Sequence, residues 1–477
     1  MQNIIKNSFI YKVLAAIYAW FGVQWGKSRI VSRFLSQDRC RPASESSLFS
    51  KIFSFIHRLF CFIFEKLRLN KLLKGSIFKN PYIWCFLTAV LAPILPTMPT
   101  LALALVSFGS LFLKFCCDRS QTLTYSPVNK YILLFIFVYA ISIVTSVDRR
   151  GSLNGGLITI VFILFSVVLQ NAISTKRQLN WFIYAIVLSG TAVALYGCYQ
   201  YVFGISSTAS WIDADMFSEL SVRVFSTLQN PNVLSEYLLL IIPIGFACVL
   251  CVDGAGKKFL MALCVAVMVV CMVLTLSRGG WLGLIFAIAI FLVLLDRRFI
   301  LVGILGLVLL YFVLPDAIIE RFTSIGDLSD TSTSYRVSIW IGTLAMLKDY
   351  WFCGIGPGTA AFNTIYPTYS LSAAYAEHSH NLFLQITCDS GIAGIVIFVI
   401  MVLSHIRMMC RAIKNEPDRK GKIFQIAILS SLSGFLVQSM TDYSFYNYRV
   451  MLMFWAIIGL GAVVARYSKL LGVPAND

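Results

Sequence analysis

The sequence predicts an all-helical integral membrane protein, and both its composition and its hydrophobic pattern support that class. Hydrophobic residues make up 58% of the 477 residues, and charged residues only 13%. A soluble domain carries about 25% charged residues. The apolar stretches are long and continuous rather than alternating with polar residues, which favours membrane helices over a β-barrel. A helix also satisfies its own backbone polar groups, as lipid requires.

About twelve apolar segments are long enough to be membrane-spanning helices. They are residues 82–95, 99–115, 131–146, 153–170, 181–203, 233–252, 259–276, 281–295, 299–314, 381–409, 424–440 and 451–466. The first two are separated by Pro93, Pro96 and Pro99, which predict a tight turn between two short helices.

The distribution of Lys and Arg predicts the orientation of these spans. With the N-terminus inside, the inner segments hold 31 of the 39 basic residues and the outer loops hold 8. Cytoplasmic loops carry the excess of positive charge, so we expect a multi-pass membrane protein with both termini cytoplasmic. The net charge of +17 then reflects topology and contact with anionic lipid. It does not indicate a nucleic-acid partner.

Residues 1–80 differ from the rest of the chain and predict a separate basic extension. Two stretches, residues 4–25 and 48–73, have the pattern of basic amphipathic helices. Such helices lie in the plane of the membrane interface and bind anionic lipids. We therefore expect a cytoplasmic or interfacial anchor at 1–80, followed by a polytopic domain at 81–470.

One predicted outer segment, residues 315–379 between the ninth and tenth spans, is much longer than the other loops. Residues 335–350 within it predict an amphipathic helix with an apolar stripe of Val337, Trp340, Ile341, Leu344 and Leu347. The nearby glycines at 354, 356 and 358 follow no predicted strand, so they do not indicate a nucleotide-binding loop. A long loop on a rigid helical bundle is a natural place for a functional site.

Polar side chains gather on the predicted outer face, where positive charge is otherwise scarce. They are Arg223, Arg278, Arg336, Glu377, His378 and His380. The planar fork of Arg is suited to binding a diphosphate, and His transfers protons near neutral pH. These residues would therefore suit a lipid diphosphate substrate and a hydroxyl acceptor.

Each of these residues also has an ordinary structural interpretation. A single Arg at a helix end commonly extends toward lipid phosphate, and a single His at a helix start is commonly a cap. Asp389 lies inside the tenth span, where a carboxylate is either functional or a polar structural partner; we favour the structural role. Asp442 and Arg449 in the last outer loop are expected to pair with each other.

The order of four motifs resembles the O-antigen ligase and polymerase family. Residues 378–395 read HSHNLFLQITCDSGIAGI, with a His-Asn pair, then an acidic residue, Gly, and a second Gly three positions on. The other matching stretches are residues 223–232, the TLSRGG string at 275–280, and residues 336–358 with Trp340 and GIGPG. The resemblance covers roughly residues 82–467, and Asp389 stands where the family commonly has Glu.

The resemblance implies an inverting glycosyltransferase of the bacterial plasma (inner) membrane. It would use glycan linked to undecaprenyl diphosphate at the outer face, without metal or other cofactor. Carried over, Arg223 and Arg278 hold the diphosphate and His380 acts on the acceptor hydroxyl. His378, Arg336, Glu377 and Asp389 are possible supporting residues. The acceptor is a glycan, lipid or protein hydroxyl, so ligase, repeat-unit polymerase and protein glycosylation all stay open.

Two alternatives come from other classes of protein. A polytopic solute transporter would often show inverted repeats and polar groups near the membrane midplane. The two halves of this chain show no such repeat, and the midplane is poor in charge. A catalytically inactive relative that serves as a scaffold is the other alternative, and the retained Arg and His residues argue against it.

Overall fold

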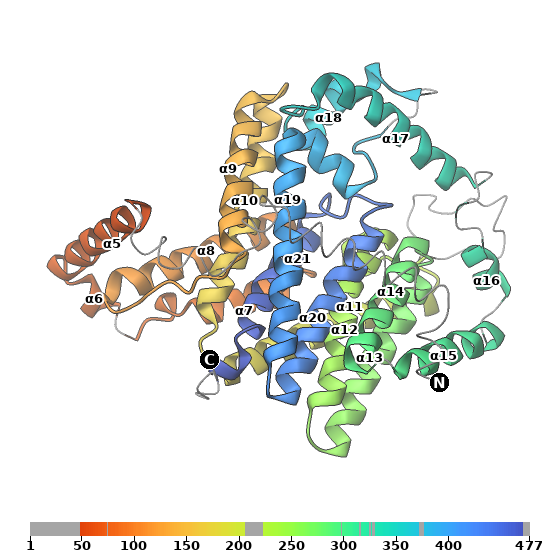
Figure 1. Cartoon of the computed structure of the whole chain (residues 1–477), viewed down its shortest axis with the longest axis horizontal. Helices are drawn as coiled ribbons and strands as arrows, with labels where there is room; N and C mark the ends of the chain where they lie inside the picture. Colours follow the sequence, from red (N-terminus) through yellow and green to blue (C-terminus); the bar gives the residue numbers. More distant parts are fainter. Residues whose placement is uncertain are drawn as a thin grey trace, which may run out of the picture. The chain divides into compact units, whose positions relative to one another are not determined.

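The computed structural model describes residues 48–73, 75–205, 223–296, 298–313, 316–323, 326, 330–371 and 376–470, and these residues form helices and no strand (Figure 1). The predicted all-helical class is therefore confirmed. The α-helices are α5 (Leu48–Lys66), α6 (Leu69–Leu72), α7 (Pro81–Leu91), α8 (Thr97–Cys117), α9 (Asn129–Thr145), α10 (Arg149–Ala172), α11 (Lys176–Val202), α12 (Pro231–Cys251), α13 (Ala255–Leu274), α14 (Arg278–Leu295), α15 (Phe299–Val313), α16 (Asp316–Thr323), α17 (Thr331–Tyr350), α18 (Thr359–Ile365), α19 (Leu382–Asn415), α20 (Arg419–Gln438), α21 (Tyr448–Val464) and α22 (Tyr467–Leu470). Short 3-10 helices are η1 (Ile77–Lys79), η2 (Ser226–Leu228) and η3 (Tyr366–Thr368).

The apolar helices make this a multi-pass membrane protein. Within the described residues, eight helices are long and apolar enough to cross a membrane: α8, α10, α11, α12, α13, α14, α19 and α20. Three shorter apolar helices are α7, α9 and α21. Each of the twelve predicted segments coincides with one helix, α7 to α15 and α19 to α21. The count of twelve crossings and the position of the termini stay predictions.

The chain divides into two compact units, which we describe separately. The first comprises residues 1–70 and 116–119. In it, residues 48–66 form the expected helix α5, which ends before Arg68 takes a left-handed backbone conformation with φ of 56°. Phe55 and Phe62 of α5 are more than half exposed within the described structure. The predicted helix at 4–25 lies outside the described residues, and the domain boundary at 80 stays a prediction.

The second unit, residues 71–115 and 120–477, holds the core. Its centre is formed by α12 and α21, whose residues are buried along nearly their whole length. Helix α10 packs on α21, and α20 packs on both α12 and α14. At Gly283 of α14 and Gly434 of α20, a Cβ on either residue would lie within 2.7 Å of the other's carbonyl oxygen. Small residues therefore let these two helices approach closely, as is common between membrane helices.

Helix α19 is interrupted at Gly391, where φ is 64° and ψ is −166°. A Cβ there would lie 2.0 Å from the carbonyl oxygen of Phe352, so only glycine fits. The segment after α17 packs into this break, with Ile392 N donating to Trp351 O (2.8 Å) and Ile355 N donating to Cys388 O (2.7 Å). The glycine run at 354–358 thus fixes the long loop to α19.

The loop helix α17 is confirmed, but apart from Leu347 the predicted apolar stripe is not the face that is buried in the described structure. The buried residues of α17 are Ile339, Gly342, Thr343, Met346 and Leu347. Two members of the predicted stripe, Ile341 and Leu344, are 49% and 53% exposed. Periodicity gives the spacing of an apolar face, whereas packing against α19 and η3 decides which face is covered.

Candidate functional site

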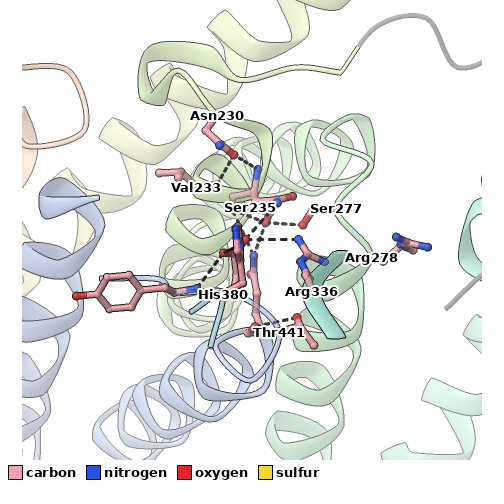
Figure 2. Close-up of polar contacts among 12 residues, drawn as sticks. Asn230, Val233, Ser235, Ser277, Arg278, Arg336, His380 and Thr441 are labelled. Atoms are coloured by element: carbon pink, nitrogen blue, oxygen red, sulfur yellow. Dashed lines mark hydrogen bonds and ion pairs between the residues drawn. The ribbon is translucent and has the colours of Figure 1, made fainter. Parts of the chain in front are cut away.

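Four arginines from four separate segments line one cavity, which we call the arginine cavity. Arg223 precedes η2, Arg278 begins α14, Arg321 lies in α16 and Arg336 lies in α17. The other lining residues are Asn232, Leu276, Ser277, Gly279, Ser332, Gln438, Thr441 and Asp442. Figure 2 shows Arg336 and Ser277 near one another in this region, with His380 and Thr441 beside them. The structure therefore brings together the three arginines that the sequence singled out and adds Arg321.

The hairpin between α13 and α14 positions two of these arginines. Ser277 caps α14 by accepting from Gly280 N, so Arg278 becomes the first residue of the helix. Arg278 forms a buried ion pair with Asp330, the N-cap of α17. Arg223 donates through Nε to Thr275 O (2.8 Å) and through Nη2 to Asn232 Oδ1 (3.0 Å). Both guanidinium groups are thereby held in fixed orientations.

Three helices begin around this cavity. Asn230, Ser277 and Asp330 are the N-caps of α12, α14 and α17, whose first turns contribute lining residues. The N-terminus of a helix carries roughly half a positive charge from its aligned peptide dipoles. Backbone and side chains therefore favour an anion at the same place.

Burial and the neighbouring guanidinium groups of Arg321, Arg336 and Arg278 lower the pKa of Arg223 to about 9. Guanidinium groups remain protonated in proteins, so this shift reflects the cost of holding a charged Arg223 in a buried position beside like charges. Burial opposes ionisation of Asp330, yet hydrogen bonds from Arg278 and Thr333 bring its pKa below the usual range. Arg278 is thus paired with Asp330, and the guanidinium groups of Arg223, Arg321 and Arg336 line the same cavity.

His380 lies beside the arginine cavity and contacts Asp442. Its Nδ1 is 3.3 Å from Asp442 Oδ1, and Arg336 Nη2 is 3.8 Å from Asp442 Oδ2. Asn232 Nδ2 also donates to Asp442 Oδ2 (3.1 Å). Burial opposes ionisation of Asp442, but His380 and Arg336 outweigh it and hold the pKa of that carboxyl below its usual range. An ionised Asp442 fixes the His380 proton on Nδ1 and leaves the Nε2 lone pair to accept a proton.

The backbone of His380 is in the left-handed region, with φ of 47°. Two contacts hold it there: Trp340 Nε1 donates to His380 O (3.3 Å), and His380 N donates to His378 Nδ1 (3.3 Å). A non-glycine residue in this region costs roughly 1–3 kcal/mol and is typical of functional sites. The conformation therefore indicates a side chain whose direction matters.

His378 is 9% exposed, and its ring centroid lies 4.2 Å from that of His380. It also contacts the rings of Tyr443 at 5.5 Å and Tyr446 at 4.7 Å. Burial, together with the neighbouring His380, lowers the pKa of His378 to about 3. His378 is consequently neutral at physiological pH and supports the His380 backbone.

The remaining predicted residues lie around this centre. Glu377 accepts a hydrogen bond from Tyr446 Oη at 2.7 Å. Asp389 is buried in α19, where it accepts from Gln385 Nε2 (2.9 Å) and from Tyr139 Oη (3.4 Å). It is not among the residues that line the arginine cavity. These contacts are those of a polar structural partner.

The expected pair of Asp442 with Arg449 is wrong. Asp442 contacts His380, Arg336 and Asn232 instead, and Arg449 Nη1 donates to Thr227 O at 3.0 Å. The sequence did offer a signal for Asp442: it is the single acidic residue in the predicted last outer loop. Arg321 carried a similar signal, as a further Arg on the face poor in cations.

His378, His380 and Asp442 each offer a ligand atom, and these atoms lie within 4.8 Å of one another. Two His and one carboxylate can hold a metal ion. Here Arg336 contacts the same carboxylate, and three more guanidinium groups line the adjacent cavity. Their charge opposes a divalent cation, so we interpret the three residues as a proton-transfer group.

The fold and the site define a multi-pass membrane protein with an arginine-lined cavity beside a His–Asp pair. Within that class, residues 263–399 match the family described as O-antigen ligase. The match includes Arg278, Arg336 and His380, and it confirms the resemblance to the O-antigen ligase and polymerase family. No curated protein matches the chain.

Proposed function

We propose that this protein is an inverting glycosyltransferase that transfers or polymerises undecaprenyl diphosphate-linked glycan at the outer face of the plasma membrane. The arginine cavity with His380 and Asp442 beside it is the observation that carries the proposal. Diphosphate is the anion best matched to several arginine forks. The family similarity supports a glycan-processing membrane protein in cell-surface polysaccharide assembly.

In the proposed reaction, an acceptor hydroxyl oxygen attacks the anomeric carbon of the donor. The bond from that carbon to the diphosphate oxygen breaks, and its electron pair leaves with undecaprenyl diphosphate. Arg223, Arg278 and Arg336 stabilise this departing charge, which is commonly the largest catalytic contribution. His380 Nε2 takes the hydroxyl proton, and Asp442 stabilises the resulting imidazolium. The products are a glycosidic bond of inverted configuration and undecaprenyl diphosphate.

The decisive experiment compares wild type with Arg278→Ala and His380→Ala in the native cell. Lys348→Ala is the matched control, because Lys348 is an exposed cation in α17 that does not line the cavity. Lipid-linked glycan and surface polysaccharide are extracted after confirming equal protein levels. We expect both site variants to accumulate lipid-linked glycan and to lose long or attached polysaccharide, while the control resembles wild type.

The accumulated species also separates the possible acceptors. Loss of chain length indicates repeat-unit polymerisation, whereas full-length glycan left on the lipid indicates a failed attachment to lipid or protein. If both variants keep the wild-type glycan profile while deletion alters only solute uptake, the transferase proposal is wrong and the protein is a transporter.

A further inference from the structure

A second cavity, separate from the arginine cavity in its lining, lies in the same unit. It has a volume of about 500 Å³ and is lined by Tyr139, Tyr443, Tyr446, Tyr448, Asn447 and Arg449, among others. Gln229, Thr159 and Thr227 add further polar groups. We call it the tyrosine cavity. Its volume falls within the range of about 300–1,000 Å³ that small-molecule sites occupy.

A continuous chain of contacts connects the two cavities through the histidines. Asp442 lines the arginine cavity and contacts His380, whose ring lies against His378. The ring of His378 contacts Tyr443 and Tyr446, which line the tyrosine cavity. The histidine pair therefore contacts the lining of both cavities: His380 contacts Asp442, and His378 contacts Tyr443 and Tyr446.

The chemistry of the tyrosine cavity is that of a carbohydrate site. Aromatic rings pack against the apolar C–H face of a sugar ring, while phenol, amide and guanidinium groups hydrogen-bond to its hydroxyls. Several side chains are already fixed: Tyr446 Oη donates to Glu377 (2.7 Å), and Arg449 Nη1 donates to Thr227 O (3.0 Å). Side chains held in place lose little entropy when a ligand binds.

The first turns of α10 leave room for this cavity. Gly155 lines it, and a Cβ at Gly155 would lie 2.8 Å from the hydroxyl oxygen of Tyr448. Any side chain there would displace Tyr448 or fill the space. Gly155 therefore sets the size of the cavity directly.

We propose that the tyrosine cavity binds the carbohydrate acceptor, so that the acceptor of this enzyme is a glycan. The inference rests on the proposed function. In an inverting displacement, the nucleophile approaches the anomeric carbon opposite the departing diphosphate. With the diphosphate in the arginine cavity, the tyrosine cavity is a second cavity whose lining contacts the histidine pair, and the acceptor sugar approaches from it. Glu377 is then a positioning residue that holds Tyr446.

The test uses Gly155→Leu, which fills the cavity, and Tyr448→Ala, which removes one aromatic wall. Gly109→Leu is the matched control, because a Cβ at Gly109 of α8 meets nothing within 4 Å. Tyr448→Phe keeps the ring and removes only the hydroxyl. Each full-length protein is purified in lipid nanodiscs and probed with saccharide released from the cell's own surface polysaccharide, using saturation-transfer NMR. Undecaprenyl diphosphate binding is measured in parallel by thermal shift.

We expect Gly155→Leu to abolish saccharide binding and Tyr448→Ala to weaken it at least about ten-fold, with undecaprenyl diphosphate binding unchanged in both. In turnover assays the KM for the acceptor rises and the KM for the lipid-linked donor does not. Saccharide binding unaffected by Gly155→Leu overturns the inference, and a rise only in the donor KM overturns the acceptor assignment. Failure of the proposed function would be recognised separately, because cells with Arg278→Ala would then show the wild-type glycan profile.

Discussion

Replacing Asp442 by Asn tests the proton-transfer role of the His380–Asp442 pair with little change in shape. The amide retains one oxygen, which can accept from His380 Nδ1, while its NH2 group replaces the oxygen that accepts from Asn232 Nδ2, and it carries no charge. When His380 takes a proton in the transition state, the carboxylate stabilises a cation centred 3.3 Å away. At an effective dielectric constant of about 20, that attraction is about 5 kcal/mol.

Solvent reduces this value, because the His380 side chain is 24% exposed and Asp442 14% exposed. We therefore expect a loss of about 3–5 kcal/mol in transition-state stabilisation, which is about a 100- to 10,000-fold decrease in rate. The attraction between a charged His380 and Asp442 is absent before proton transfer. The decrease should therefore fall on kcat more than on KM.

The assay follows release of undecaprenyl diphosphate by purified protein in lipid nanodiscs, with lipid-linked glycan extracted from a deletion strain as donor. Asp349→Asn is the control, since Asp349 is an exposed carboxylate in α17 that accepts from Tyr369 Oη. Asp442→Asn activity within about three-fold of wild type, at equal melting temperature, would refute the assigned role of the carboxylate.

Three further predictions concern the same region. Asp330→Ser keeps a hydroxyl cap for α17 but breaks the buried ion pair with Arg278. The Arg278 guanidinium then loses its fixed orientation, so undecaprenyl diphosphate binding weakens. Asp330→Ala also loses the cap, so its free energy of unfolding should be about 1 kcal/mol below that of Asp330→Ser. Equal melting temperatures of Asp330→Ala and Asp330→Ser would contradict the capping role. The pKa of His378 is about 3 in the folded protein and about 6.5 in the unfolded chain. Between these pH values the unfolded state binds more protons, so the free energy of unfolding decreases as the pH falls. From pH 7 to pH 5 the loss is about 2 kcal/mol, and it should disappear in His378→Phe, as thermal melts at both pH values can check. Activity should survive dialysis against EDTA, because the guanidinium groups oppose a cation at His378, His380 and Asp442; loss of turnover that a divalent ion restores would reverse that conclusion.

Much of the fold was predictable, because lipid imposes a simple requirement of length and hydropathy on each helix. All twelve predicted segments coincide with helices. The buried face of α17 was not predictable in the same way. Its apolar residues occur on more than one side, and Ile341 and Leu344 stay exposed while Ile339 and Met346 are buried.

The convergence of Arg223, Arg278 and Arg336 on one cavity agrees with their being cations on a face poor in positive charge. Asp442 was assigned the wrong partner, because the nearest cation in sequence is Arg449, whereas the folded chain places His380 and Arg336 beside it. The tyrosine cavity had no sequence signal at all. Its residues come from six separate segments of the chain, and tyrosines at helix ends of a membrane protein are ordinary interfacial residues.

The balance of charge around the arginine cavity argues for a bound anion and against a purely structural role. Within the described residues, Arg223, Arg278, Arg321 and Arg336 line the cavity, and two carboxylates, Asp330 and Asp442, contact them. Unpaired charge away from water costs several kcal/mol per group, and replacing it by apolar side chains is often neutral or stabilising. Four guanidinium groups lining one mostly buried cavity repel one another, which is unfavourable for the empty protein. A diphosphate would reduce this repulsion. After transfer the same attraction would retard release of undecaprenyl diphosphate, so product departure is the step we expect the arginines to slow.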